Sequence, residues 1–124
     1  MDGFRPLTTV TDMPPGTMKT ASLDGREYLV ARVGEEFFVT DGRCPHLGGH
    51  LEKGLLEDTV VTCPLHKSQF DLRDGSVLRW TDWQGAALKI ATKVKSPRSL
   101  KTYELRVEGD TLLVGIERTP PAAD

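Results

Sequence analysis

Two short segments hold most of the metal-binding side chains of this sequence. Cys44-Pro45-His46 and Cys63-Pro64-Leu65-His66 contain both cysteines of the 124-residue chain and two of its three histidines. Two thiolates and two imidazoles form a ligand set that suits zinc or an iron–sulfur centre. A nucleophilic Cys–His enzyme would instead need one activated thiol, one base and an orienting group. Two near-equivalent Cys/His pairs do not match that requirement, so we expect a metal site.

The spacing within the pairs favours a two-iron centre over zinc. Structural zinc sites usually draw on ligand pairs separated by about two to five residues, whereas one residue separates Cys44 from His46. Binding a single ion through both members of so short a pair is cramped. In a two-iron centre, each segment sends its cysteine to one iron and its histidine to the other. Cys44 and Cys63 would hold one iron, and His46 and His66 would hold the second.

The elements that must position these pairs are short β-strands. Turn signals such as Asp24-Gly25 and Asp74-Gly75 recur at close spacing, and β-prone segments lie between them, which is typical of an all-β sandwich or barrel. Both Cys/His pairs fall in loops between strands, and Gly48 and Gly49 allow the first loop to bend tightly. The strands are expected at residues 17–23, 27–33, 36–40, 59–62, 69–72, 102–108 and 112–116.

Composition indicates one ordinary globular domain, expected over residues 1–118, with a disordered tail at 119–124. A net charge of −2 gives no overall attraction to nucleic acid or anionic lipid. No apolar run approaches the length of a membrane span, and the N-terminus lacks the layout of a signal peptide. We therefore expect a cytoplasmic protein without nucleic-acid or membrane partners. In that reducing compartment a Cys44–Cys63 disulfide is not expected.

One segment departs from the balanced charge. Residues 79–101 carry six basic residues against a single acid, Asp82. One interpretation is a solvated basic stretch, and the other is a docking patch for an acidic partner. The residues of the predicted patch are Lys89, Lys93, Lys95, Arg98 and Lys101.

The sequences of the two loops resemble the two motifs of a known family. Residues 44–51, Cys-Pro-His-Leu-Gly-Gly-His-Leu, resemble the first Rieske box, C-x-H-x-G-x-x-L. Residues 63–70, Cys-Pro-Leu-His-Lys-Ser-Gln-Phe, resemble the second box, C-P-x-H-x-x-x-F. The resemblance implies a Rieske-type antiparallel β-sandwich or barrel, with a small cluster-binding subdomain at about 43–71. It implies one 2Fe–2S cluster held by Cys44, His46, Cys63 and His66.

The resemblance also assigns roles around the cluster. Leu47, Pro64, Leu65 and Pro97 would form an apolar rim that shields the cluster and meets the partner. His50 is variable in the family, so it is interpreted as a loop histidine. Trp80 and Trp83 are expected to serve packing.

Two departures from the family pattern narrow the subclass. Rieske proteins of respiratory and photosynthetic complexes carry a second cysteine in each box, where this chain has Gly49 and Leu65. The chain is therefore similar to the ferredoxin type. In high-potential members, a serine at position 68 donates to a bridging sulfide, and a tyrosine stands where this chain has Phe70. Ser68 is expected to raise the reduction potential, and the alternative is that it only caps a turn.

The implied function is one-electron transfer, from a flavin-dependent reductase to a Rieske-type ring-hydroxylating oxygenase. The chain would then be one component of a multicomponent dioxygenase rather than a stand-alone enzyme. One alternative is the small subunit of an assimilatory nitrite reductase. A more distant alternative is a zinc-stabilised binding module. The sequence does not identify the redox partners, the final substrate, the oligomeric state or the role of residues 80–98.

Overall fold

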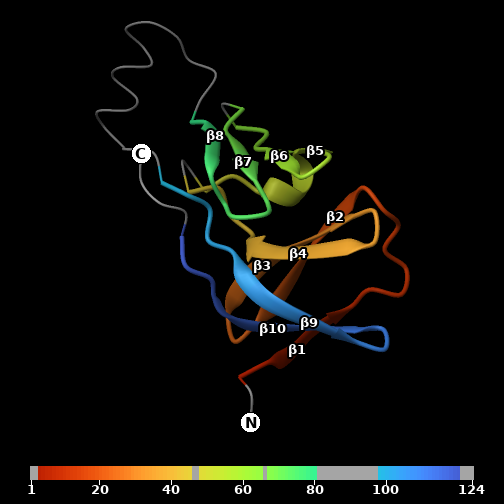
Figure 1. Cartoon of the computed structure of the whole chain (residues 1–124). Coiled ribbons are helices and arrows are strands. Elements are labelled where there is room, and N and C mark those ends of the chain that lie inside the picture. Colours follow the sequence, from red (N-terminus) through yellow and green to blue (C-terminus); the bar gives the residue numbers. More distant parts are fainter. Residues whose placement is uncertain (1–2, 46–47, 66, 81–97, 121–124) are drawn as a thin grey trace, which may run out of the picture.

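The computed structural model describes residues 3–45, 48–65, 67–80 and 98–120, and these form three antiparallel sheets (Figure 1). The expected all-β fold is confirmed. The first sheet has the order β1-β10-β9, the second β2-β3-β4, and the third β5-β6-β7-β8. The strands are β1 (Arg5–Thr9), β2 (Thr17–Leu23), β3 (Arg26–Val33), β4 (Glu36–Asp41), β5 (Leu55–Glu57), β6 (Val60–Thr62), β7 (Gln69–Asp71), β8 (Val77–Arg79), β9 (Tyr103–Glu108) and β10 (Thr111–Glu117).

The hairpin of β2 and β3 follows directly from its turn sequence. Asp24 and Gly25 both have positive φ, 53° and 78°. This is the geometry of a type I′ turn, whose twist matches that of the flanking strands. The register is continuous from Leu23↔Arg26 to Thr17↔Arg32. Local turn chemistry therefore fixes the pairing of these two strands.

Three strands lie outside the ranges expected from the sequence. β1 contains Pro6 and pairs only with β10, and a proline is tolerated there because an edge strand has unpaired N–H positions. β5 and β8 have three residues each, too few for a visible alternation of polar and apolar side chains. All three are defined by pairing partners that sequence periodicity does not reveal. Among the described residues, no helix is long and apolar enough to span a bilayer.

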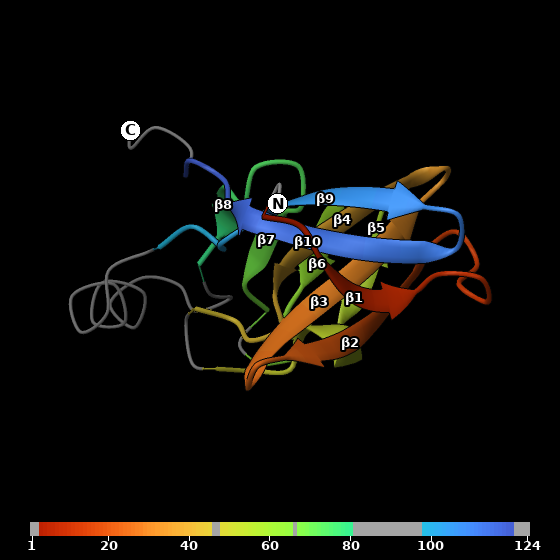
Figure 2. The same ribbon diagram turned by 90° about the horizontal axis from the view of Figure 1, so that it is seen from below.

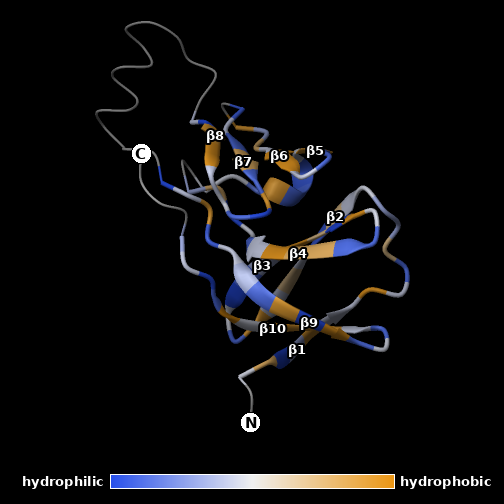
Figure 3. Cartoon of the chain, viewed as in Figure 1, coloured by the Kyte–Doolittle hydropathy of each residue, from blue (hydrophilic) through white to orange (hydrophobic). Residues whose placement is uncertain are grey.

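The first two sheets pack on one another, as Figures 1 and 2 show. A bridge between Thr40 and Thr102 links β4 to the start of β9, and the Asp41 N–H donates to the Lys101 carbonyl at 3.0 Å. The core between the sheets includes Val30, Val39, Tyr103 and Leu112. Apolar and polar residues alternate along β9 (Figure 3), because one face of this strand covers that core.

β3 is buried on both faces, and this joins the sandwich to the third sheet. Tyr28 and Val30 belong to the core described above. Leu29 and Ala31 point to the opposite face and enter a second core. The other members of this second core are Cys44, Leu51, Val61, Cys63, Phe70, Leu72, Trp80 and Leu100. Both cysteines therefore lie in a hydrophobic cluster that packs against one face of β3.

Candidate metal centre

The first cysteine lies in a tightly closed loop between β4 and the 3-10 helix η1 (Leu51–Lys53). The Cys44 N–H donates to the Gly49 carbonyl at 2.9 Å, and the Gly48 N–H donates to the Cys44 carbonyl at 2.8 Å. Gly48 has a φ of 74°, which favours glycine because a Cβ would be strained there. These two hydrogen bonds tie Cys44 to Gly48 and Gly49.

The second cysteine lies in a loop between β6 and β7. The Cys63 N–H donates to the Ser68 carbonyl at 2.8 Å, so the hairpin closes immediately beyond the ligand segment. Lys67 turns the chain with a φ of 58°, an uncommon conformation for a residue with a side chain. Cys63 and Ser68 thus stand at the two ends of a short loop that the third sheet presents.

The two loops bring the two cysteines together. Both are buried thiols that form no disulfide, with relative exposures of 3% for Cys44 and 0% for Cys63. A hydrogen bond with the Cys44 thiol, together with burial, raises the pKa of the Cys63 thiol above its ordinary value. Metal binding needs thiolates, so it must release these protons. Two converging buried thiols on closed loops fit one iron of a two-iron cluster.

Gly49 is packed against the Cys63 thiol. A Cβ at position 49 would lie 2.7 Å from Cys63 Sγ and 3.2 Å from Leu65 Cδ1. Positions 49 and 65 are those where the respiratory Rieske proteins have their second cysteines, and the structure shows that these two positions are adjacent. In this chain the contact is made by a glycine and a leucine. The absence of a side chain at position 49 leaves space for the thiol.

The remaining predicted ligands lie outside the described residues. These are His46 and His66, together with the rim residues Leu47 and Pro97. Their roles therefore stay predictions. Of the described rim residues, Pro64 is exposed, and the Leu65 side chain is 47% exposed. An apolar side chain thus stands on the surface directly beyond a buried cysteine.

Ser68 is fully buried, and its hydroxyl donates a hydrogen bond to the Trp80 carbonyl. Trp80 is also buried, and its ring meets Phe70 edge-to-face, with the centroids 6.5 Å apart. The packing role expected for Trp80 is confirmed. The hydroxyl has one proton, which cannot be donated to Trp80 and to a cluster sulfide at once. The expected sulfide bond of Ser68 stays a prediction.

Charged residues that the sequence did not single out hold the first loop in place. Arg43 donates from Nη1 to the Gly48 carbonyl at 3.0 Å and from Nε to Glu27 Oε2 at 3.3 Å. Glu27 lies on β3, so this ion pair connects the first cysteine loop to the strand that supports the second core. No local sequence pattern predicts this link, because Arg43 lies 16 positions after Glu27.

A cavity of about 330 Å³ opens beside the first loop. Pro45 lines it, and so do four basic residues, Arg43, Arg98, Lys101 and Arg118. Asp41 and Glu117 are its acidic residues. Arg98 and Lys101 belong to the predicted basic patch, whereas Lys89, Lys93 and Lys95 lie outside the described residues.

Comparison with known proteins agrees with this geometry. Residues 4–104 match the model of the Rieske [2Fe-2S] domain. The ferredoxin component of biphenyl 2,3-dioxygenase from Rhodococcus jostii (strain RHA1) is 34% identical over 106 residues, which cover 86% of each chain. The biphenyl dioxygenase ferredoxin subunit of Pseudomonas sp. (strain KKS102) is 34% identical over 119 residues, which cover 93% of this chain and 94% of that one.

Solved structures show the same fold. A ferredoxin chain in the complex of reduced oxygenase and oxidized ferredoxin of carbazole 1,9a-dioxygenase superposes with a TM-score of 0.73. It is 23% identical, and the match covers 98% of this chain and 100% of that one. A putative nitrite reductase small subunit matches with a TM-score of 0.68 at 17% identity, over 90% and 96% of the two chains. Family match, relatives and buried cysteine pair agree: this chain belongs to the Rieske [2Fe-2S] family, and its cofactor is a Rieske-type 2Fe–2S cluster.

Proposed function

We propose that this chain is the ferredoxin component of a ring-hydroxylating dioxygenase system. It would carry one electron at a time from a flavin-dependent reductase to a Rieske-type terminal oxygenase. The observation that carries the proposal is the pair of buried cysteines on two closed loops, in a chain that aligns with biphenyl dioxygenase ferredoxins over more than nine-tenths of the length of one of them. A cytoplasmic location belongs to the same proposal, since cysteines that bind metal and form no disulfide suit a reducing compartment.

The side chains around the cysteines support electron transfer rather than substrate chemistry. When bound, the cluster accepts and releases one electron. Cys44 and Cys63 are shielded from water by the second core, which keeps solvent from the sulfur ligands. Leu65 is exposed beside them and offers an apolar contact for a partner. Small interfaces of this kind are weak and transient, as a carrier requires.

The basic residues beside Pro45 extend this surface toward an acidic partner. Arg98 and Lys101 are exposed, and together with Arg43 and Arg118 they outnumber the two acids that line the same cavity. A positive surface next to the first ligand loop would steer a negatively charged partner toward the cluster. We include Lys89, Lys93 and Lys95 in this proposed patch on the strength of the sequence.

The rival functions have less support. The nitrite reductase small subunit shares the fold at 17% identity, whereas the ferredoxin components of biphenyl dioxygenases are 34% identical. The zinc-stabilised module is wrong, because the family to which the chain belongs is defined by a 2Fe–2S cluster.

The test is reconstitution of the electron-transfer chain. Purified holoprotein is mixed with the reductase and oxygenase of a biphenyl dioxygenase system, and NADH-driven formation of hydroxylated product is measured. We expect product formation to depend on this chain and to fall as ionic strength rises. Turnover that is the same with and without this chain, for this system and for other ring-hydroxylating oxygenases, would remove the proposal.

The basic patch has its own variants. Arg98→Gln and Lys101→Gln should weaken coupling to the oxygenase and reduce its salt dependence. Arg106→Gln, on β9, serves as the control for loss of one positive charge, and it should leave coupling unchanged. Equal effects of all three substitutions would show that net charge, and not the patch, matters.

A further inference from the structure

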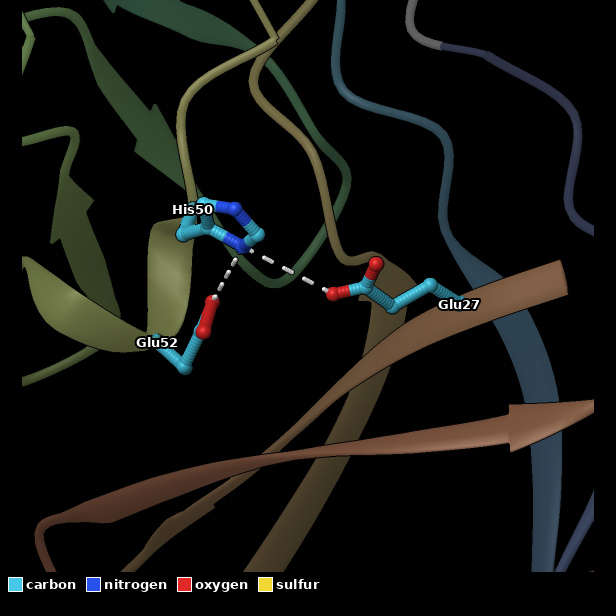
Figure 4. A group of neighbouring side chains, drawn as sticks. All are labelled: Glu27, His50 and Glu52. Atoms are coloured by element: carbon cyan, nitrogen blue, oxygen red, sulfur yellow. Dashed lines mark ion pairs between the residues drawn. The ribbon is translucent and has the colours of Figure 1, made fainter.

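His50, Glu27 and Glu52 converge on one point at the base of the first loop (Figure 4). The three residues come from two elements: Glu27 from β3, and His50 and Glu52 from the segment that begins η1. The geometry points to a second metal site, in which these three side chains bind a divalent transition-metal ion such as Zn²⁺. Nothing in the electron-transfer role requires this site, and the inference does not rest on that role.

The distances between the three side chains fit ligands around one ion better than they fit hydrogen bonds. His50 Nδ1 lies 3.6 Å from Glu52 Oε1 and 3.8 Å from Glu27 Oε1. Both values exceed the hydrogen-bond range. Ligand atoms about 2.1 Å from a tetrahedral zinc ion stand roughly 3.4 Å apart. The two distances from His50 Nδ1 are therefore within a few tenths of an ångström of that spacing, and the three ligand atoms all lie within 4.8 Å of one another.

The buried oxygen of Glu52 provides an independent observation. Glu52 Oε1 is shielded from solvent and lacks a hydrogen-bond partner, and it is the one buried side-chain nitrogen or oxygen of the described residues in that condition. It faces His50 Nδ1 (Figure 4). A buried carboxylate oxygen that accepts no hydrogen bond destabilises the fold, because its lost hydration is not replaced. A bound cation removes that destabilisation.

The neighbouring contacts hold the ligands in position. Arg43 takes Glu27 Oε2, which leaves Oε1 of the same carboxylate directed at His50. The Gly42 N–H donates to the Glu27 carbonyl at 3.0 Å, and Arg43 pairs with His50 through an isolated β-bridge. Leu51, fully buried, anchors the chain between His50 and Glu52. The site is therefore built from positions that the core and the first loop already fix.

The ligand chemistry separates this site from the cluster. One imidazole nitrogen and two carboxylate oxygens form a harder set than cysteine and histidine, and such a set suits zinc or another first-row divalent ion. Three protein ligands leave a position for water. Because the ion would join β3 to the segment just after the first ligand loop, its binding should also stabilise that loop.

The experiment is isothermal titration of Zn²⁺ into the holoprotein, with the visible absorbance of the cluster recorded at each addition. We expect one saturable binding event per chain without bleaching. His50→Asn and Glu52→Gln should each weaken it at least tenfold, since outer-shell changes alone cost about 10–100-fold in metal affinity. Glu35→Gln removes an exposed carboxylate whose side chain is 93% accessible, and it should change nothing.

Three results would each overturn the site. These are the absence of a saturable event, an event that bleaches the cluster, and unchanged affinity in a His50→Asn/Glu52→Gln double variant. The first would show that the three side chains form only a network of ion pairs. Circular dichroism of each variant checks that the fold is intact, and Glu52→Gln keeps the size of the side chain.

Discussion

The hydroxyl of Ser68 donates a hydrogen bond to the backbone carbonyl of Trp80. Both residues are buried, so the bond links the end of the second cysteine loop to the residue that follows β8. It gives Ser68 a structural partner at the position where high-potential Rieske proteins use a serine to tune the cluster. The two roles compete for one proton, and this makes Ser68 the most informative residue to change.

Ser68→Ala separates the two roles. We expect the wild-type hydroxyl to keep donating to Trp80 in the holoprotein. The variant should then lose about 1–3 kcal/mol of unfolding free energy, because the buried Trp80 carbonyl loses its donor. Its reduction potential should stay nearly constant. Denaturant unfolding and potentiometry measure the two effects. A fall in the potential would show instead that the hydroxyl turns to a sulfide, as the family resemblance implies.

Gly49→Ala should impair cluster binding. The added methyl group would lie 2.7 Å from Cys63 Sγ, a distance that real Cβ atoms do not adopt, so the thiol or the loop must shift. We expect less visible absorbance per mole of protein and less iron per mole of protein than in the wild type. Gly34→Asn is the matched control, since Gly34 has a φ of 59° that asparagine tolerates and open space around it. Full cluster occupancy in Gly49→Ala would contradict the packing argument.

The stability of the fold should depend on pH through Asp71. Hydrogen bonds from Arg73, with Nη2 2.7 Å from Asp71 Oδ2, lower the pKa of this nearly buried carboxyl. Because the pKa of Asp71 is lower in the folded state than in the unfolded state, its ionisation stabilises the fold at pH values above the unfolded-state pKa of about 4. That stability is lost as the pH falls through the folded-state pKa. Unfolding measured below about pH 4 should show this loss, and Asp71→Asn should reduce it.

The control for the pH experiment is Asp12→Asn, which removes an exposed carboxylate. Its stability profile should follow that of the wild type. If the free energy of unfolding fell equally steeply below pH 4 in the wild type and in Asp71→Asn, the ion pair of Asp71 with Arg73 would not contribute to the pH dependence of stability.

The predicted histidine ligands are tested by removing each one. His46→Ala and His66→Ala should each abolish the Rieske electron paramagnetic resonance signal, because one iron loses an imidazole. His50→Ala is the matched control from the same loop, and it should keep the signal. A Rieske signal in His46→Ala would show that another side chain serves as the ligand.

Particular residues show how far the sequence reaches. The types and spacing of Cys44, Cys63 and their neighbouring histidines determined the kind of centre, because ligand chemistry is a property of the side chains themselves. Asp24-Gly25 determined the β2–β3 hairpin, because a type I′ turn is encoded in two adjacent residues. These signals are local, so they could be recognised without the fold.

The tertiary structure decided what depends on distant pairing. Only the fold shows that β3 is buried on both faces and supports two cores. The same holds for the contact of Gly49 with Cys63, the bond from Ser68 to Trp80, and the convergence of Glu27 with His50. Each joins residues that are 12 or more positions apart, and a sequence pattern of short period does not encode which distant residue a side chain will meet.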